Sequence, residues 1–170
     1  MKPERAKAFT LVEILVVVAL LGILAAIVIP AVASSGNSAR EAALKQDMNL
    51  LQRFILIYTC HHLEIAPGYA NGNSSLNPTE AVFQAQALMA TNQVGATAAI
   101  GTNGYNRGPY LQKIPVNPVN QMSTILMLAN GNDFPANADG TTGWIYSAEK
   151  QEIRPNCTGM DTNGNAYYDY

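Results

Sequence analysis

The hydrophobic pattern of the chain begins with an apolar run over residues 9–33 that contains one charged side chain, Glu13. From Ile14 to Ala33 no residue is charged, and a helix of that length can cross the hydrocarbon core of a bilayer. The residues before the run include the cations Lys2, Arg5 and Lys7. The pattern therefore predicts a membrane-spanning helix near the N-terminus, with a carboxylate close to its front.

A second pattern extends this helix beyond the membrane. Apolar side chains recur at spacings of three and four residues, as in a helix with one buried face. We predict a single helix from Phe9 to about Leu63, roughly 80 Å long, whose outer part packs against a head. The apolar stripe consists of Leu44, Met48, Leu51, Ile55 and Tyr58, widened by Leu50, Phe54 and Ile57, and the polar residues Arg40, Glu41, Lys45, Asp47, Gln52 and Arg53 fall mostly off it.

Two features interrupt the predicted helix. Pro30 removes a backbone hydrogen bond, and residues 34–38, which include Gly36, are poor helix formers. We expect bending or melting between Gly22 and Ser38, above all where such helices pack together. The alternative is that residues 34–38 are a linker at the membrane edge.

The remaining sequence predicts a small head over residues 64–170. Asn77 or Thr79 is placed to cap a short helix that runs to Ala90. Residues 123–129 resemble a strand, and residues 144–146 and 151–154 resemble a hairpin. The predicted fold class is α+β, in which the second half of the long helix (residues 34–63) packs on a small antiparallel sheet.

The net charge of the chain bears on one class of partner, nucleic acids. The net charge is −2, and removal of residues 1–8 would make it −4, because three cations and Glu4 would leave. This balance gives no electrostatic support for nucleic-acid binding.

Glu13 is the main clue to function. A carboxylate at the edge of a membrane span is costly without a positive partner. Cleavage between Ala8 and Phe9 would create an α-amino group that can neutralise such a carboxylate, and the apolar run holds no other cation.

The sequence around Glu13 resembles the type IV prepilin family, which includes the pseudopilins of type II secretion. The shared features are the basic leader, the run Phe9-Thr10-Leu11-Val12-Glu13 and the apolar helix with Gly22 and Pro30. The family usually has Gly before the cut, where this chain has Ala8. The resemblance implies a leader over residues 1–8, a mature N-terminus at Phe9 that is N-methylated, and contact of Glu13 with the terminal amine of a neighbouring subunit.

The same resemblance implies partners and a location. A prepilin peptidase would process the chain, and an inner-membrane assembly platform would build it into a filament with copies of itself and other pilin-like subunits. The precursor would cross the bacterial inner membrane once with its head outside the cytoplasm, and the filament would be periplasmic or extracellular. Residues 108–115 also resemble the segment before the sheet of major pseudopilins, although Asn117-Pro118-Val119-Asn120 stands where those proteins have Asp-Pro-Trp-Gly.

Two simpler interpretations compete with this one. The N-terminus could be a secretory signal peptide cleaved after Ala33, because Ala31-Val32-Ala33 fits an A-x-A site. It could also be a plain membrane anchor. Either would make the protein a monomeric binding domain, exported or anchored.

Two further groups of residues are candidates for chemistry. Cys60 and Cys157 could form a disulfide in an exported head. His61 and His62 follow Cys60 directly, so three ligands could not converge on a metal there, and the histidines read as a helix terminus. No motif for a catalytic serine or a phosphate loop is present, so we predict a protein that is not an enzyme.

The C-terminal segment carries the only candidate metal site. Asp161, Asn163, Asn165 and Asp169 place oxygen side chains at positions one, three, five and nine of a partial calcium loop. Ala166 stands where such loops have glycine, and the chain ends before a twelfth position. Pseudopilins similar to this chain can hold calcium in a C-terminal loop, so calcium is a candidate ligand, although an Asn/Gly turn remains the preferred interpretation. No cofactor is required by any motif.

Overall fold

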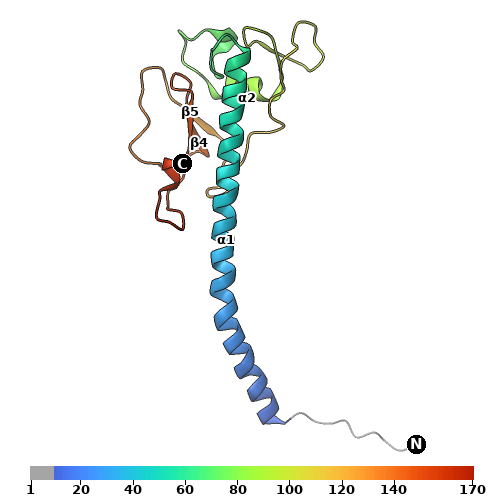
Figure 1. Cartoon of the computed structure of the whole chain (residues 1–170), viewed down its shortest axis with the longest axis vertical. Coiled ribbons are helices and arrows are strands. Elements are labelled where there is room, and N and C mark those ends of the chain that lie inside the picture. Colours follow the sequence, from blue (N-terminus) through green and yellow to red (C-terminus); the bar gives the residue numbers. More distant parts are fainter. Residues whose placement is uncertain (1–9) are drawn as a thin grey trace, which may run out of the picture. The chain divides into compact units, whose positions relative to one another are not determined.

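The computed structural model describes residues 10–170, with the backbone alone at residues 30, 31 and 33–35. The chain divides into two units, which meet between Ala39 and Arg40. Helix α1 (Leu11–His61) contributes to both units. It is assigned as helix throughout, which agrees with the predicted long helix (Figure 1).

The first unit is helical from Leu11 to Ala39. Every residue from Leu11 to Ile29 is exposed, and this stretch is long and apolar enough to cross a membrane. Exposure of so many large apolar side chains is unfavourable in water, so this surface requires lipid or another protein.

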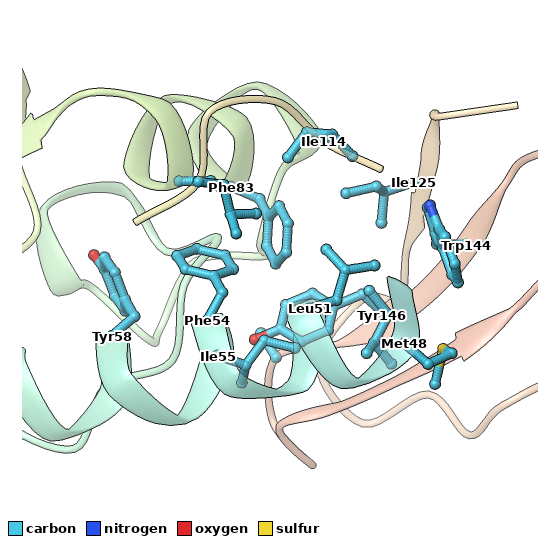
Figure 2. Packing of buried hydrophobic residues seen from close by; sticks show 14 of the residues in the cluster. Met48, Leu51, Phe54, Ile55, Tyr58, Phe83, Ile114, Ile125, Trp144 and Tyr146 are labelled. Carbon is cyan, nitrogen blue, oxygen red and sulfur yellow. The ribbon is translucent and has the colours of Figure 1, made fainter. Parts of the chain in front are cut away.

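The second unit is built on the outer part of α1. All five residues of the predicted stripe are almost fully buried: Leu44, Met48, Leu51, Ile55 and Tyr58. Phe54 is also buried, and its ring meets that of Phe83 at 5.2 Å and 87°. Figure 2 shows how these side chains of α1 face Phe83, Ile125, Trp144 and Tyr146 across the core.

The prediction that Leu50 and Ile57 widen the buried stripe is wrong. They are 44% and 46% exposed, and Leu56 between them is 62% exposed. The buried face is therefore narrower than the sequence suggested. Glu41 is the opposite case, because it falls on the buried face and is only 8% exposed.

A short helix covers part of this core. Helix α2 (Glu80–Leu88) begins at Thr79, whose hydroxyl accepts a hydrogen bond from the N–H of Val82. The prediction of a capped helix in this region is confirmed, with Thr79 as the cap. Phe83, Gln86 and Ala87 form its buried face.

Two small sheets complete the head. Strands β1 (Ala90–Thr91) and β2 (Thr97–Ala98) are antiparallel. Strands β3 (Ile125–Met127), β4 (Trp144–Ser147) and β5 (Glu152–Pro155) form the larger sheet in that order. Two short 3₁₀ helices, η1 (Ala70–Gly72) and η2 (Tyr167–Asp169), lie in the connecting and C-terminal segments.

The larger sheet is mixed, whereas the sequence predicted an antiparallel one. The β4–β5 hairpin is antiparallel as expected, but β3 pairs with β4 in parallel, with Ile125 opposite Trp144. A parallel pair needs a long connection that returns the chain to the same end, and residues 128–143 provide it. Trp144 is fully buried, and its indole N–H donates to the carbonyl of Pro115 at 3.0 Å, which ties the segment before the sheet to β4.

Candidate functional site

The first turn of α1 is the centre of the candidate assembly site. The backbone N–H and the hydroxyl of Thr10 donate to Glu13 Oε2, at 2.8 and 3.0 Å. In return the N–H of Glu13 donates to the Thr10 hydroxyl oxygen at 3.2 Å. This reciprocal pair is a capping box, in which two backbone donors that lack helical partners are satisfied by side chains.

The sequence interpretation missed this local role of Glu13. The signal was present, because Thr10-Leu11-Val12-Glu13 has the Thr-x-x-Glu spacing of a capping box. Glu13 therefore has hydrogen-bond partners within its own chain, and its presence does not by itself require a positive partner from elsewhere.

Several predicted residues lie at or beyond the edge of this site. The leader, Ala8 and Phe9 lie outside the described residues, so the cleavage and methylation sites stay predictions. Gly22 and Gly36 lie within α1, and both have open space where a Cβ would stand. Their role in bending, with that of Pro30, also stays a prediction.

The predicted disulfide between Cys60 and Cys157 is not formed. Both are free thiols, with Cys60 exposed on α1 and Cys157 buried after β5. Cys157 lines a cavity together with Ala166 and Tyr168 of the C-terminal segment. Tyr167 in the same segment is hydrogen-bonded to Glu41 of α1. Because Glu41 and Cys60 are roughly 28 Å apart along the axis of α1, the two thiols lie toward opposite ends of the head. A disulfide needs Cα atoms within about 7 Å of each other.

The two histidines close α1 in different ways. His61 is exposed, and its Nδ1 lies 3.2 Å from the Tyr110 hydroxyl. His62 is 2% exposed, with Nδ1 2.7 Å from the Tyr58 carbonyl oxygen and Nε2 3.0 Å from the Thr91 hydroxyl. The carbonyl can only accept, so Nδ1 donates to it and Nε2 accepts from Thr91. The histidines thus serve the helix terminus, and His62 also joins α1 to β1.

The four candidate calcium ligands are brought to one groove. Asp161, Asn163, Asn165 and Asp169 line an open groove of about 770 Å³ between the C-terminal segment and α1. Asp161 Oδ1 accepts from the N–H groups of Asn163 and Asn165, both at 2.8 Å. Burial raises the pKa of Asp161, but hydrogen bonds from Asn165, Tyr170 and Asn163 outweigh it and hold the pKa well below its usual range.

The described residues 10–170 contain no group of three or more His, Cys, Asp or Glu side chains that could hold a metal ion. The groove instead holds a cationic side chain of the protein itself, because the ammonium of Lys45 lies 4.7 Å from the centre of the Tyr170 ring. The fold thus brings together the four oxygen-bearing side chains that the sequence indicated, but only Asp161 and Asp169 among them are carboxylates.

Comparisons with known proteins point to one family. The family model of the prokaryotic N-terminal methylation motif matches residues 5–29, which include Glu13 and its capping partner. Type II secretion system core protein G of Pseudomonas aeruginosa is 29% identical over 143 residues, which cover 84% of this chain and 81% of that protein. No solved structure gives a significant match. The chain therefore carries a prepilin-type N-terminal methylation motif, and over most of its length it is similar to a core protein of type II secretion. The long helix and the α+β head are consistent with a pilin-like fold.

Proposed function

We propose that this protein is the structural subunit of a filament, either a type II secretion pseudopilus or a related type IV pilus-like fibre. The observation that carries the proposal is the apolar surface of Leu11–Ile29, which is exposed at every residue, has a carboxylate (Glu13) in its first turn and lies within the prepilin-type motif. Such a surface can be covered by lipid in a precursor and by copies of itself in a filament. A structural role also agrees with the similarity to a core protein of a secretion system.

In this proposal the precursor crosses the inner membrane once. Lys2, Arg5 and Lys7 hold the leader on the cytoplasmic side, and the head lies outside the cytoplasm. A prepilin peptidase cuts after Ala8 and methylates the new N-terminus at Phe9. The assembly platform in the inner membrane then adds the subunit to others of its kind and to related pilin-like subunits.

Glu13 would act twice in this sequence of events. In the precursor it caps α1 through Thr10, as the structure describes. After cleavage its negative charge would attract the terminal amine of a neighbouring subunit in a medium of low dielectric constant, where such a pair is strong. This contact would set the axial register of one subunit on the next.

Two substitutions separate these roles of Glu13. Glu13→Gln keeps the capping box, because glutamine also caps at this position, but removes the charge. Glu13→Ala removes both. The proposal predicts that both variants are found in the membrane but yield far fewer filaments than the natural chain. Filaments are sheared from the cells, or from cells that overproduce the assembly machinery. The yield is then measured by immunoblotting the sheared fraction.

A third variant serves as the control for capping. Thr10→Val removes the hydroxyl of the capping box and leaves the carboxylate in place. It should assemble better than Glu13→Gln if charge is what matters. Natural filament yield from Glu13→Gln would contradict the proposed role of the charge.

A monomeric, membrane-anchored binding domain is the second candidate function. The capping box favours this function because it gives Glu13 a stabilising role in a single helix, without a neighbouring subunit. This candidate predicts no self-assembly of any variant, and it predicts that Glu13→Gln and the natural chain behave alike.

A further inference from the structure

The C-terminal segment is fastened to α1 by a buried carboxylate. Glu41 Oε1 accepts from the backbone N–H of Thr162 at 2.9 Å, and Glu41 Oε2 accepts from the Thr162 hydroxyl at 3.1 Å. The Tyr167 hydroxyl also donates to Glu41 Oε1, at 3.5 Å. Thr162 and Tyr167 lie 121 and 126 positions after Glu41 in the sequence. The contacts therefore attach the C-terminal segment to α1.

A second carboxylate closes the segment on itself. Asp161 Oδ1 receives the two backbone N–H groups of Asn163 and Asn165. Asp161 Oδ2 receives the side-chain amide of Asn165 at 3.1 Å and the hydroxyl of Tyr170 at 3.0 Å. Both oxygens of this carboxylate are thus met by donors of the protein.

This set of donors does not suit calcium. Calcium takes six to eight oxygen ligands, several of them carboxylates. Around Asp161 and Glu41 the neighbours are N–H and O–H groups, whose positive ends point at the oxygens a cation would need. Asn165 presents its amide nitrogen to Asp161 rather than its oxygen. The groove also holds the ammonium of Lys45, which would repel a second cation.

We propose that a hydrogen-bonded clasp, made by Glu41 with Thr162 and by Asp161 with Tyr170, fastens the C-terminal segment of this protein without calcium. Lys45 supplies the positive charge of the groove through its position over the Tyr170 ring. Charge-assisted hydrogen bonds of this kind are the stronger ones in proteins, and a buried carboxylate is stable only with such partners. The proposal goes beyond the filament function and does not depend on it.

Calcium itself is the first test. The full chain in detergent micelles is heated in millimolar CaCl₂ and in excess EGTA, and its C-terminal segment is probed by limited proteolysis with mass detection. A ligand that binds only the folded state must raise the melting temperature. The clasp predicts identical melting curves and identical cleavage rates at residues 161–170 in both buffers. A higher melting temperature or slower cleavage in calcium would overturn it.

Substitutions test the clasp directly. Glu41→Gln keeps the size of the side chain but removes the negative charge that strengthens the hydrogen bonds from Thr162 and Tyr167. The clasp predicts cleavage at residues 161–170 that is several-fold faster than in the natural chain. Glu64→Gln makes the same change at an exposed residue and should leave the cleavage rate unaltered.

A milder variant covers the case in which Glu41→Gln unfolds the whole head. Tyr170→Phe removes the hydroxyl that donates to Asp161 and keeps the ring beneath Lys45. It should accelerate cleavage of the C-terminal segment without a loss of the cooperative melting of the core. If neither Glu41→Gln nor Tyr170→Phe changes the cleavage rate, the clasp does not hold the segment.

Discussion

The imidazole of His62 stacks on the ring of Tyr58, one helical turn earlier, with ring centroids 3.8 Å apart and planes 12° apart. Burial lowers the pKa of His62, a hydrogen bond to the Tyr58 carbonyl partly offsets this, and the positive charges of Arg107 and His61 lower it further. The folded head therefore holds this histidine neutral at a pH where the unfolded chain would protonate it.

Acid should consequently destabilise the head through His62. Because the folded pKa lies below the ordinary value of about 6.5, the unfolded chain binds more protons as the pH falls below that value. The free energy of unfolding should decrease from about pH 6.5 downward, by at most about 1.4 kcal/mol per pH unit for this one group. Urea unfolding of the full chain in detergent between pH 8 and 5 measures this slope.

Two variants isolate the contribution of His62. His62→Gln should lose stability at pH 8 but show a flatter pH dependence between 6.5 and 5. His61→Gln changes the exposed neighbour and should largely keep the slope of the natural chain, reduced only slightly by the lost charge. Equal slopes for His62→Gln and the natural chain would contradict this account.

The two faces of α1 give a matched pair of substitutions. Leu51 is fully buried, whereas Leu56 is 62% exposed on the same helix. Leu51→Ala removes core packing and leaves a cavity, so it should cost about 2–5 kcal/mol of unfolding free energy. Leu56→Ala should change the free energy of unfolding by no more than about 0.5 kcal/mol, because an exposed leucine makes few packing contacts in the dispersed subunit. Similar costs for the two would mean that the buried face is misassigned.

Gly95 gives a test of the contact between α1 and the loop after β1. Its φ is +79°, and a Cβ there would overlap the Tyr58 hydroxyl and stand 3.1 Å from Gln86 Nε2. Gly101 has a similar φ of +89° but open space around it. Gly95→Ala should therefore lower the melting temperature clearly more than Gly101→Ala, which carries the backbone strain alone. Equal shifts would show that steric contact at Gly95 is unimportant.

The free cysteines predict a clear labelling pattern. Cys60 is exposed and should react quickly with a maleimide in the folded protein. Burial raises the pKa of the Cys157 thiol, and its lack of exposure also slows the reaction, so it should react only after unfolding. Mass spectrometry without reductant should find one label in the folded chain and two in the unfolded chain. Absence of label until a reductant is added would indicate a disulfide after all.

Sequence patterns predicted the parts of the fold that depend on local order. The long apolar run, the stripe from Leu44 to Tyr58 and the Thr79 cap are all periodic or short-range signals, and the structure confirms the elements they predicted. The β4–β5 hairpin also follows from neighbouring residues. These elements need little knowledge of what lies elsewhere in the chain.

The errors arose where distant segments decide the outcome. The parallel pairing of β3 with β4 depends on how residues 128–143 return, which no local pattern specifies. Glu41 was placed among polar residues off the stripe, although its spacing of three from Leu44 puts it on the buried face, where Thr162 satisfies it. A disulfide between Cys60 and Cys157 would require both to lie at one end of the head, which the folding of the C-terminal segment decides, and both are free thiols. The capping box of Thr10 and Glu13 is an exception, because its Thr-x-x-Glu spacing is a local signal that the sequence prediction did not use.

The most direct test of the central claim is the N-terminus of the protein recovered from its native membrane, determined by intact mass and N-terminal sequencing. The account predicts a chain that begins at Phe9 and is heavier by one methyl group than the unmodified sequence. A chain that begins at Ser34 would show a cleaved signal peptide, and one that keeps Met1 would show a plain anchor. Either result would contradict processing as a filament subunit.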